Sequence, residues 1–139
     1  MSLERTFAII KPDAVATGHA GEILAIIEQA GFRVLALRMT RLTERQAQGF
    51  YAVHSQKPFF AGLVKFMTEG PIVVMALERE DAILKWRETM GSTNPANAAE
   101  GTIRKRFATS IERNSVHGSD APETAATELR FFFSTANLL

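Results

Sequence analysis

The sequence predicts an α+β fold in which strands and helices follow one another in the order βαββαβ. Three observations support this prediction. The chain has 139 residues, a usual length for one domain. Its apolar runs are short enough for strands, and the segments between them carry the spacing of amphipathic helices. It contains no cysteine, so its core forms without disulfides, and thiolate metal sites and cysteine nucleophiles are excluded.

Two strands and a helix are predicted near the N-terminus. Residues 3–10 and 33–39 alternate apolar side chains with a period of two, which is typical of strands. Pro12 ends the first strand because its nitrogen has no hydrogen to donate. Between the strands, residues 21–30 repeat apolar side chains three and four positions apart. This spacing indicates a helix, and Gly31 is suited to ending it.

The middle of the chain predicts two short helices, a strand and a longer helix. The letters TERQ, which start at Thr43, have the form of a capping box and open a helix that continues to Tyr51. A second helix is expected over 58–67, because a proline stands at its start and EGP follows its end. The run IVVMAL at 72–77 indicates a strand, and residues 80–90 are expected to form a helix.

The C-terminal third completes the predicted pattern. Residues 91–99 are rich in Gly, Ser, Thr, Asn and Pro and are expected to form a loop. A helix is predicted over 122–128, and the apolar run LRFFF at 129–133 is expected to form the fourth strand. Residues 1–139 are therefore expected to be a single domain with a ferredoxin-like βαββαβ fold. In this fold a four-stranded antiparallel sheet carries its helices on one face.

The charges of the chain are nearly balanced. Lys and Arg number 16 against 15 for Asp and Glu, a net charge of +1, which gives no general footprint for nucleic acid or anionic membrane. No apolar run approaches the ~20 residues of a membrane span, and no signal peptide is evident, so a soluble cytoplasmic protein is expected. One cluster stands out: Arg104, Lys105, Arg106 and Arg113. Such a cluster is usually a solvated face, but its position just before His117 also suits an anion site.

His117 is the residue that packing explains least. It lies in NSVHGSD, at 114–120, where small polar residues and a glycine leave the ring uncrowded. His19 is instead expected at the surface or at a helix cap, and His54 in a corner between helices. A histidine nucleophile needs a neutral ring and a partner that fixes its tautomer. Glu128, on the following predicted helix, is a candidate partner, although a solvated charge is the commoner role of such a glutamate.

Phosphate is the electrophile that suits such a histidine. Phosphoryl transfer relies on positioning and on charge neutralisation by Arg, Lys and Mg²⁺. Lys11, Arg87 and Arg104 could supply these contacts if the fold brings them together. Neither GxxxxGK[ST] nor GxGxxG occurs in the chain, so both glycine-rich phosphate loops are excluded. A nucleotide must be held here in some other way.

Four blocks of the sequence resemble the nucleoside diphosphate kinase family: FAIIKPDAV (7–15), FYAVHSQKPFF (50–60), MGSTNPANAAEGTIRKRFA (90–108) and NSVHGSDAPETAATEL (114–129). They follow in order over nearly the whole chain, and NxxHGSD with an upstream KPDA is highly specific. The resemblance implies transfer of the γ-phosphoryl group from a nucleoside triphosphate to a nucleoside diphosphate, by a ping-pong route through a phosphohistidine. It also implies Mg²⁺ bound mainly through the nucleotide phosphates, with no protein side chain assigned as a ligand, and a homo-oligomer, either tetramer or hexamer.

The same resemblance implies roles for individual residues. The catalytic positions are His117 as the phosphorylated nucleophile, Glu128 as the carboxylate that orients it, and Tyr51 in support. The nucleotide-binding positions are Lys11, Phe59, Arg87, Thr93, Arg104 and Asn114, with Leu63 near the base. An aromatic stacking platform explains tolerance of different bases, because every base has a π-face.

Two other interpretations compete with an active kinase. One is a nucleic-acid-binding or regulatory module that uses the basic cluster, but the net charge is near zero and the paired aromatics of an RNA-recognition sheet are not evident. Nucleic acid is therefore not expected as the main partner. The other is a catalytically inactive homologue, which fits poorly because no expected site residue is missing. Lys105 and Arg106 depart from the small or acidic residues of many relatives, so the electrostatics beside Arg104 can differ.

Overall fold

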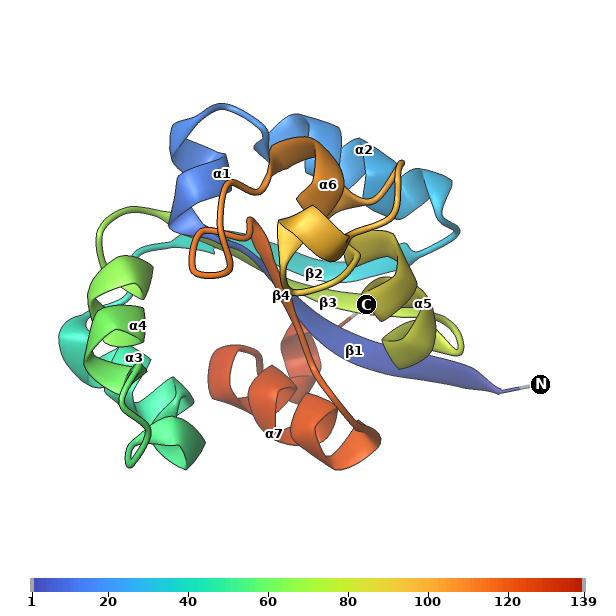
Figure 1. Cartoon of the computed structure of the whole chain (residues 1–139). Coiled ribbons are helices and arrows are strands. Elements are labelled where there is room, and N and C mark those ends of the chain that lie inside the picture. The colour runs from blue at the N-terminus through green and yellow to red at the C-terminus, as the bar shows by residue number, and fades with distance from the viewer. Residues whose placement is uncertain (1, 139) are drawn as a thin grey trace.

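A four-stranded antiparallel sheet forms the centre of the computed structural model, which describes residues 2–138. The strands lie in the order β2-β3-β1-β4 (Figure 1). They are β1 (Leu3–Ile10), β2 (Arg33–Thr40), β3 (Ile72–Glu80) and β4 (Val116–Gly118). The α+β fold class with a four-stranded antiparallel sheet is confirmed, and β1, β2 and β3 begin where the sequence predicts strands.

The helices pack around this sheet and join its strands. They are α1 (Pro12–Ala16), α2 (Ala20–Gln29), α3 (Glu44–Phe50), α4 (Phe60–Met67), α5 (Ala82–Met90), α6 (Ile103–Phe107) and α7 (Pro122–Phe132). The capping box that opens α3 is confirmed, since the Thr43 side chain accepts from the backbone of Gln46 while the Gln46 side chain accepts from the backbone of Thr43. The five-residue helices α1 and α6 were not predicted, because one turn carries too little periodicity to be recognised.

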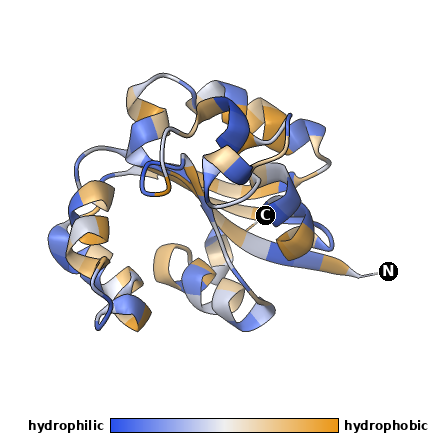
Figure 2. Cartoon of the chain, in the orientation of Figure 1, coloured by the Kyte–Doolittle hydropathy of each residue, from blue (hydrophilic) through white to orange (hydrophobic). Residues whose placement is uncertain are grey.

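Helices cover both faces of the sheet, so the expectation of helices on one face is wrong. Phe7 and Ile9 of β1 point into a core shared with α3, α4 and α7, whereas Ala8 and Ile10 point into a second core shared with α1, α2, α5 and α6. All four side chains are at most 1% exposed. The helices show alternating orange and blue bands (Figure 2), as expected of helices that bury one side against a sheet.

The fourth strand is not the one that the sequence predicts. Residues 129–133 were expected to be a strand, but α7 continues through Phe132. Its buried Ala125 and Leu129 lie four residues apart, a helical spacing. The fourth strand is β4, which pairs with Ala8–Ile10 of β1 and contains His117. With only three residues it has no alternation for a sequence pattern to reveal.

None of the helices within residues 2–138 combines the length and the apolar character needed to cross a membrane.

Candidate functional site

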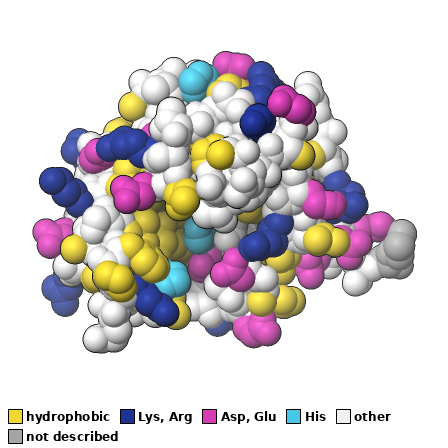
Figure 3. Space-filling model, in the orientation of Figure 1, with side chains coloured by type: hydrophobic (Ala, Val, Ile, Leu, Met, Phe, Trp, Pro, Cys, Tyr) yellow, Lys and Arg dark blue, Asp and Glu magenta, His cyan; other side chains and the backbone are white. Residues whose placement is uncertain are grey.

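A cleft of about 1060 Å³ opens beside β4. Eight of the nine predicted site residues line it: Lys11, Tyr51, Phe59, Arg87, Thr93, Arg104, Asn114 and His117. The ninth, Glu128, contacts the His117 ring from α7. Figure 3 shows a hollow near the centre of the view, with hydrophobic atoms (yellow) along its left side and Lys and Arg atoms (dark blue) to its right. Residues distant in sequence therefore meet in one cleft, as the sequence interpretation requires.

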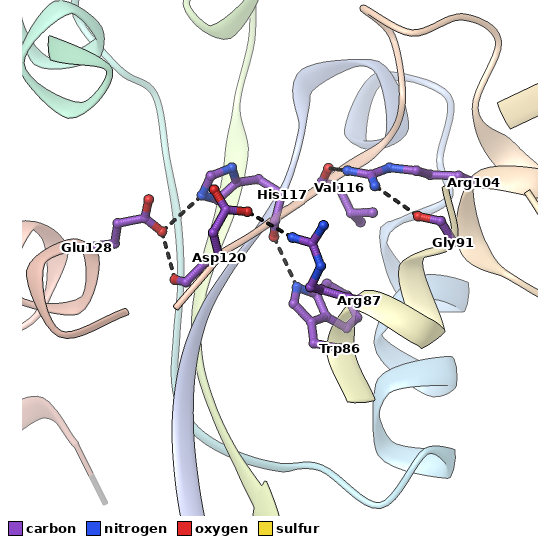
Figure 4. Close-up of polar contacts among 9 residues, drawn as sticks. Trp86, Arg87, Gly91, Arg104, Val116, His117, Asp120 and Glu128 are labelled. Atoms are coloured by element: carbon purple, nitrogen blue, oxygen red, sulfur yellow. Dashed lines mark hydrogen bonds and ion pairs between the residues drawn. The ribbon is translucent and has the colours of Figure 1, made fainter. Parts of the chain in front are cut away.

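The His117 ring is held by one carboxylate oxygen. Nε2 of His117 lies 3.0 Å from Oε1 of Glu128, and the same oxygen accepts a hydrogen bond of 2.8 Å from Oγ of Ser119 (Figure 4). A carboxylate can only accept, so the ring hydrogen lies on Nε2. In the neutral form of the ring, Nδ1 then keeps its lone pair and is available as an acceptor or a nucleophile.

Aromatic side chains surround the same ring. The centroids of Phe50, Phe7 and Tyr51 lie 5.6, 6.1 and 6.2 Å from that of His117, all with steep, edge-on geometry. The Tyr51 hydroxyl is buried and has no hydrogen-bond partner within residues 2–138. Burial, with a smaller effect from the Glu128 carboxylate, raises the pKa of Tyr51. These rings limit the orientations open to the imidazole.

The backbone of β4 is anchored from α5. The indole Nε1 of Trp86 donates a hydrogen bond of 3.1 Å to the carbonyl oxygen of His117 (Figure 4). Gly118 permits this approach, since a Cβ there would lie 2.5 Å from Cδ1 and 2.6 Å from Nε1 of Trp86. The indole is fully buried and cannot move aside. The glycine of HGSD is therefore required by packing next to the candidate nucleophile.

Arg104 binds the same strand from α6. Its guanidinium donates to the carbonyl oxygens of Asn114 (3.2 Å), Gly91 (3.0 Å) and Val116 (2.8 Å). Burial, and secondarily the nearby positive charge of Arg87, lowers the pKa of Arg104 to about 10. The side chain keeps a positive charge beside the cleft and donates to carbonyls of β4, of the turn before it and of Gly91. It therefore helps to build the site as well as to charge it.

Lys11 lies at the end of β1 and meets Asn114. Its Nζ donates to Oδ1 of Asn114 at 2.8 Å, and Nδ2 of Asn114 donates to the carbonyl of Thr93 at 3.5 Å. Only 8% of Lys11 is exposed. Burial and the positive charge of Arg104 lower the pKa of Lys11 to about 8, although Asp13 opposes the shift. A buried cation therefore lies in the cleft that contains His117.

The mouth of the cleft is more open. Arg87 donates to Oδ1 of Asp120 at 2.8 Å, and both side chains are more than half exposed (Figure 4). Phe59 is 53% exposed, and the His54 ring centroid lies 5.4 Å from its own. His54 and Asp120 line the cleft, although sequence reasoning assigned neither to it. Both stand inside the blocks that carry the family resemblance, which is the signal that could have identified them.

The arrangement defines a class of site: a histidine held by a carboxylate, beside buried Lys and Arg side chains, with an exposed aromatic ring at the entrance. Lys and Arg neutralise the oxygens of a phosphoryl group, and an aromatic face accepts a nucleobase. Comparison with known proteins agrees with this class. Residues 4–138 match the family model described as nucleoside diphosphate kinase. The chain belongs to the nucleoside diphosphate kinase family and is a phosphotransferase.

Relatives and solved structures match over nearly their full length. A nucleoside diphosphate kinase from Syntrophotalea carbinolica is 61% identical, covering 99% of this chain and 100% of that protein. One from Nitratidesulfovibrio vulgaris is 58% identical, covering 99% of each. The Aquifex aeolicus enzyme structure matches with a TM-score of 0.97 at 44% identity, covering 99% of this chain and 100% of that one. A Halobacterium salinarum enzyme in complex with CDP matches with a TM-score of 0.94 at 38% identity, covering 99% and 92%.

Proposed function

We propose that the chain moves the γ-phosphoryl group of a nucleoside triphosphate onto a nucleoside diphosphate by way of Nδ1 of His117. The observation that carries this proposal is the contact between Nε2 of His117 and Glu128, because it leaves Nδ1 as the free nucleophile. Nδ1 attacks the γ-phosphorus, the bond from phosphorus to the bridging oxygen breaks, and the diphosphate leaves. A second diphosphate then takes the group from Nδ1. This is a ping-pong reaction through a phosphohistidine.

Glu128 and Tyr51 support the nucleophile in this mechanism. As Nδ1 bonds to phosphorus, the imidazole ring gains positive charge. The Glu128 carboxylate, 3.0 Å from Nε2, stabilises that charge and keeps the hydrogen on Nε2. Tyr51 is buried beside the ring and limits its rotation. Preorganised groups of this kind lower the barrier because they need no rearrangement during the reaction.

The phosphate chain is held by the charged and polar residues of the cleft. Lys11 and Arg104 supply positive charge from buried positions, and Arg87 supplies an exposed guanidinium that is paired with Asp120. Asn114 accepts a hydrogen bond from Lys11 and donates one to the carbonyl oxygen of Thr93, and we assign Asn114 and Thr93 to the phosphate and sugar oxygens. Each charged hydrogen bond of this kind contributes about 1.5–3 kcal/mol.

The nucleobase stacks on Phe59, with Leu63 beside it in the lining of the cleft. The half-exposed ring offers an apolar face without a pocket for the edges of a base, which supports tolerance of different bases. The Halobacterium structure that matches this chain contains CDP, and we propose that nucleotides occupy the corresponding cleft here.

Mg²⁺ fits this site as an ion carried by the nucleotide. Within residues 2–138 no group of three or more His, Asp or Glu side chains is arranged to hold a metal ion. The polar lining of the cleft contains Lys, Arg, Asn and Thr side chains together with two carboxylates, Glu88 and Asp120. Such a lining binds phosphate oxygens, which can themselves carry Mg²⁺ with several of its waters. When bound, the ion supplies further neutralisation of phosphate charge. Lys11 and Arg104 orient the remaining oxygens toward His117.

We further propose that the chain forms a homo-oligomer, either a tetramer or a hexamer, in which each subunit is a single domain. We place this oligomer in the cytoplasm, where nucleotides are abundant. The support is strand β2, which stands at the edge of the sheet and exposes 47% of Leu37 and 57% of Met39. A free strand edge with apolar side chains is a surface that a second copy can cover. Light scattering distinguishes four from six subunits, and a monomer would refute the proposal.

The nucleic-acid interpretation receives no support from the basic cluster. Arg104 is buried beside the cleft, Arg106 pairs with Glu22 at 3.4 Å, and Arg113 pairs with Glu69 at 2.8 Å. Arginines that are buried or paired with glutamates do not form the continuous basic face that binds a nucleic-acid backbone. The basic cluster therefore favours no second function.

The decisive experiment uses ATP labelled with ³²P in its γ-phosphoryl group and measures transfer of that label to the protein and then to GDP. The protein is incubated with this ATP and Mg²⁺, freed of nucleotide, and then given GDP. We expect acid-labile, alkali-stable label on the protein that moves to GDP. His117→Ala should abolish labelling, whereas His19→Ala, outside the cleft, should leave it unchanged. Label on folded His117→Ala protein, or none on the folded wild type, would refute the proposed mechanism.

A further inference from the structure

Asp13, in the KPDA motif, has no role in the mechanism above, yet it is bonded to the segment that carries the nucleophile. It belongs to α1, and its Oδ2 accepts a hydrogen bond of 3.1 Å from the backbone N–H of Ser115. Ser115 lies between Asn114 and β4, two residues before His117. The carboxylate therefore joins two parts of the chain that are distant in sequence at a point next to the site.

The backbone at Ser115 needs such a support. Its φ is +73°, in the left-handed region that residues with a Cβ rarely adopt. The Ser115 side chain does not hold this conformation, because its Oγ is buried and has no hydrogen-bond partner within residues 2–138. Both backbone polar groups are held instead: the N–H by Asp13, and the carbonyl oxygen by the N–H of Lys11 at 2.8 Å.

This turn determines how the two sides of the site face each other. Before it, Asn114 bonds to Lys11 through its side chain and to Arg104 through its carbonyl oxygen. After it, His117 lies on β4, paired with Ile9. A rotation about φ of Ser115 would turn one segment relative to the other. The strained residue is therefore the joint that sets the position of Asn114 relative to His117.

We propose that Asp13 is a positioning residue that holds the left-handed turn at Ser115, and thereby sets the relative position of Asn114 and His117. The inference rests on the proposed function, since it concerns the same site. It assigns to the Asp13 carboxylate the role of a hydrogen-bond acceptor, and not that of a charge acting on Lys11. Asp13 does raise the pKa of Lys11, against the lowering effects of burial and of Arg104. Its role as an acceptor and its role as a charge must therefore be separated experimentally.

Two substitutions at position 13 separate acceptor from charge. Asp13→Asn removes the charge but keeps an oxygen that can accept from Ser115, whereas Asp13→Ala removes both. We expect Asp13→Ala to slow phosphorylation of His117 by about 100-fold in single-turnover labelling at saturating ATP, because small misplacements of reacting groups have effects of this size. Asp13→Asn should stay within about 3-fold of the wild type, a difference of less than 1 kcal/mol. An Asn variant as slow as the Ala variant would overturn the inference.

A second substitution at Ser115 tests the joint itself. Glycine adopts a positive φ without strain, so Ser115→Gly in the Asp13→Ala background should restore most of the lost rate. Ser115→Ala in that background is the matched control: it also removes Oγ but keeps the strained Cβ, and should restore nothing. Equal rates for the two double variants would overturn the inference. Labelling of the wild-type protein in parallel separates the role of Asp13 from the proposed function. If the wild type takes up no label, the proposed function itself is refuted.

Discussion

Replacing Glu128 by Gln tests whether its charge drives the reaction. Oε1 lies 3.0 Å from Nε2 of His117, and the two side chains are 14% and 18% exposed, so water screens them little. Full charges about 4 Å apart attract by about 4 kcal/mol at an effective dielectric constant of about 20. If half a charge develops on the ring in the transition state, the loss is about 2 kcal/mol, a rate ratio of about 30.

The assay is the single-turnover rate of His117 phosphorylation at saturating ATP, stopped in alkali and counted as label on the protein. Glu123→Gln is the matched control, because it makes the same change on an exposed position of α7 and should leave the rate unchanged. If Glu128→Gln reacts at a rate within about 3-fold of the wild type, the activation free energy has changed by less than about 1 kcal/mol. That result would refute the proposal that the charge of Glu128 stabilises the transition state. The carboxylate would then only orient the ring, which an amide oxygen also does.

Three further predictions concern the walls of the cleft. Arg104→Ala should lower kcat/KM by an amount equivalent to about 1.5–3 kcal/mol. It should also lower the denaturant midpoint, because three backbone carbonyls each lose one donor. An unchanged kcat/KM would remove Arg104 from phosphate binding. The role proposed for Lys11 requires its charged form, and burial lowers its pKa to about 8. We therefore expect kcat/KM to fall as the pH rises through that value, and Lys11→Arg to move this decline to higher pH. Gly118→Ala should destabilise the fold by about 1–3 kcal/mol, since its Cβ would overlap the buried Trp86 indole; unchanged thermal and urea unfolding would contradict the packing argument.

Long elements with a clear period were predictable from the sequence. Alternation identified β1 and β2, and the capping box at Thr43 fixed the start of α3. The run at 129–133 misled the prediction because consecutive apolar residues suit a buried strand and a buried helix equally. In the structure Phe132 packs on Phe7 with a centroid distance of 5.2 Å, and Phe133 belongs to the same core. The spacing of Ala125 and Leu129 suits a helix, but the apolar run alone does not decide between helix and strand, and tertiary packing selects the helix.

The candidate site was predictable through its motifs, but the forces that assemble it were not. Sequence patterns placed His117 in a loop, whereas the structure places it on a three-residue strand. The strand has too few residues for pairing with β1 alone to explain its stability. Its stability depends on side chains from three other elements: the Trp86 indole, the Arg104 guanidinium and, at the preceding turn, the Asp13 carboxylate.

Each of these side chains bonds to a backbone atom, and a backbone atom has no signature in a sequence. A search by residue type therefore finds candidate phosphate-binding groups, such as Lys11, and overlooks the side chains that hold the segment of His117 in place. The same physics explains why Asp13 stands in a motif without an obvious chemical task. The carboxylate stabilises a conformation that serine disfavours, and that conformation places Asn114 and His117 at one cleft. The KPDA motif thus combines two functions. Lys11 supplies positive charge to the cleft, and Asp13 fixes the backbone geometry in which that charge acts.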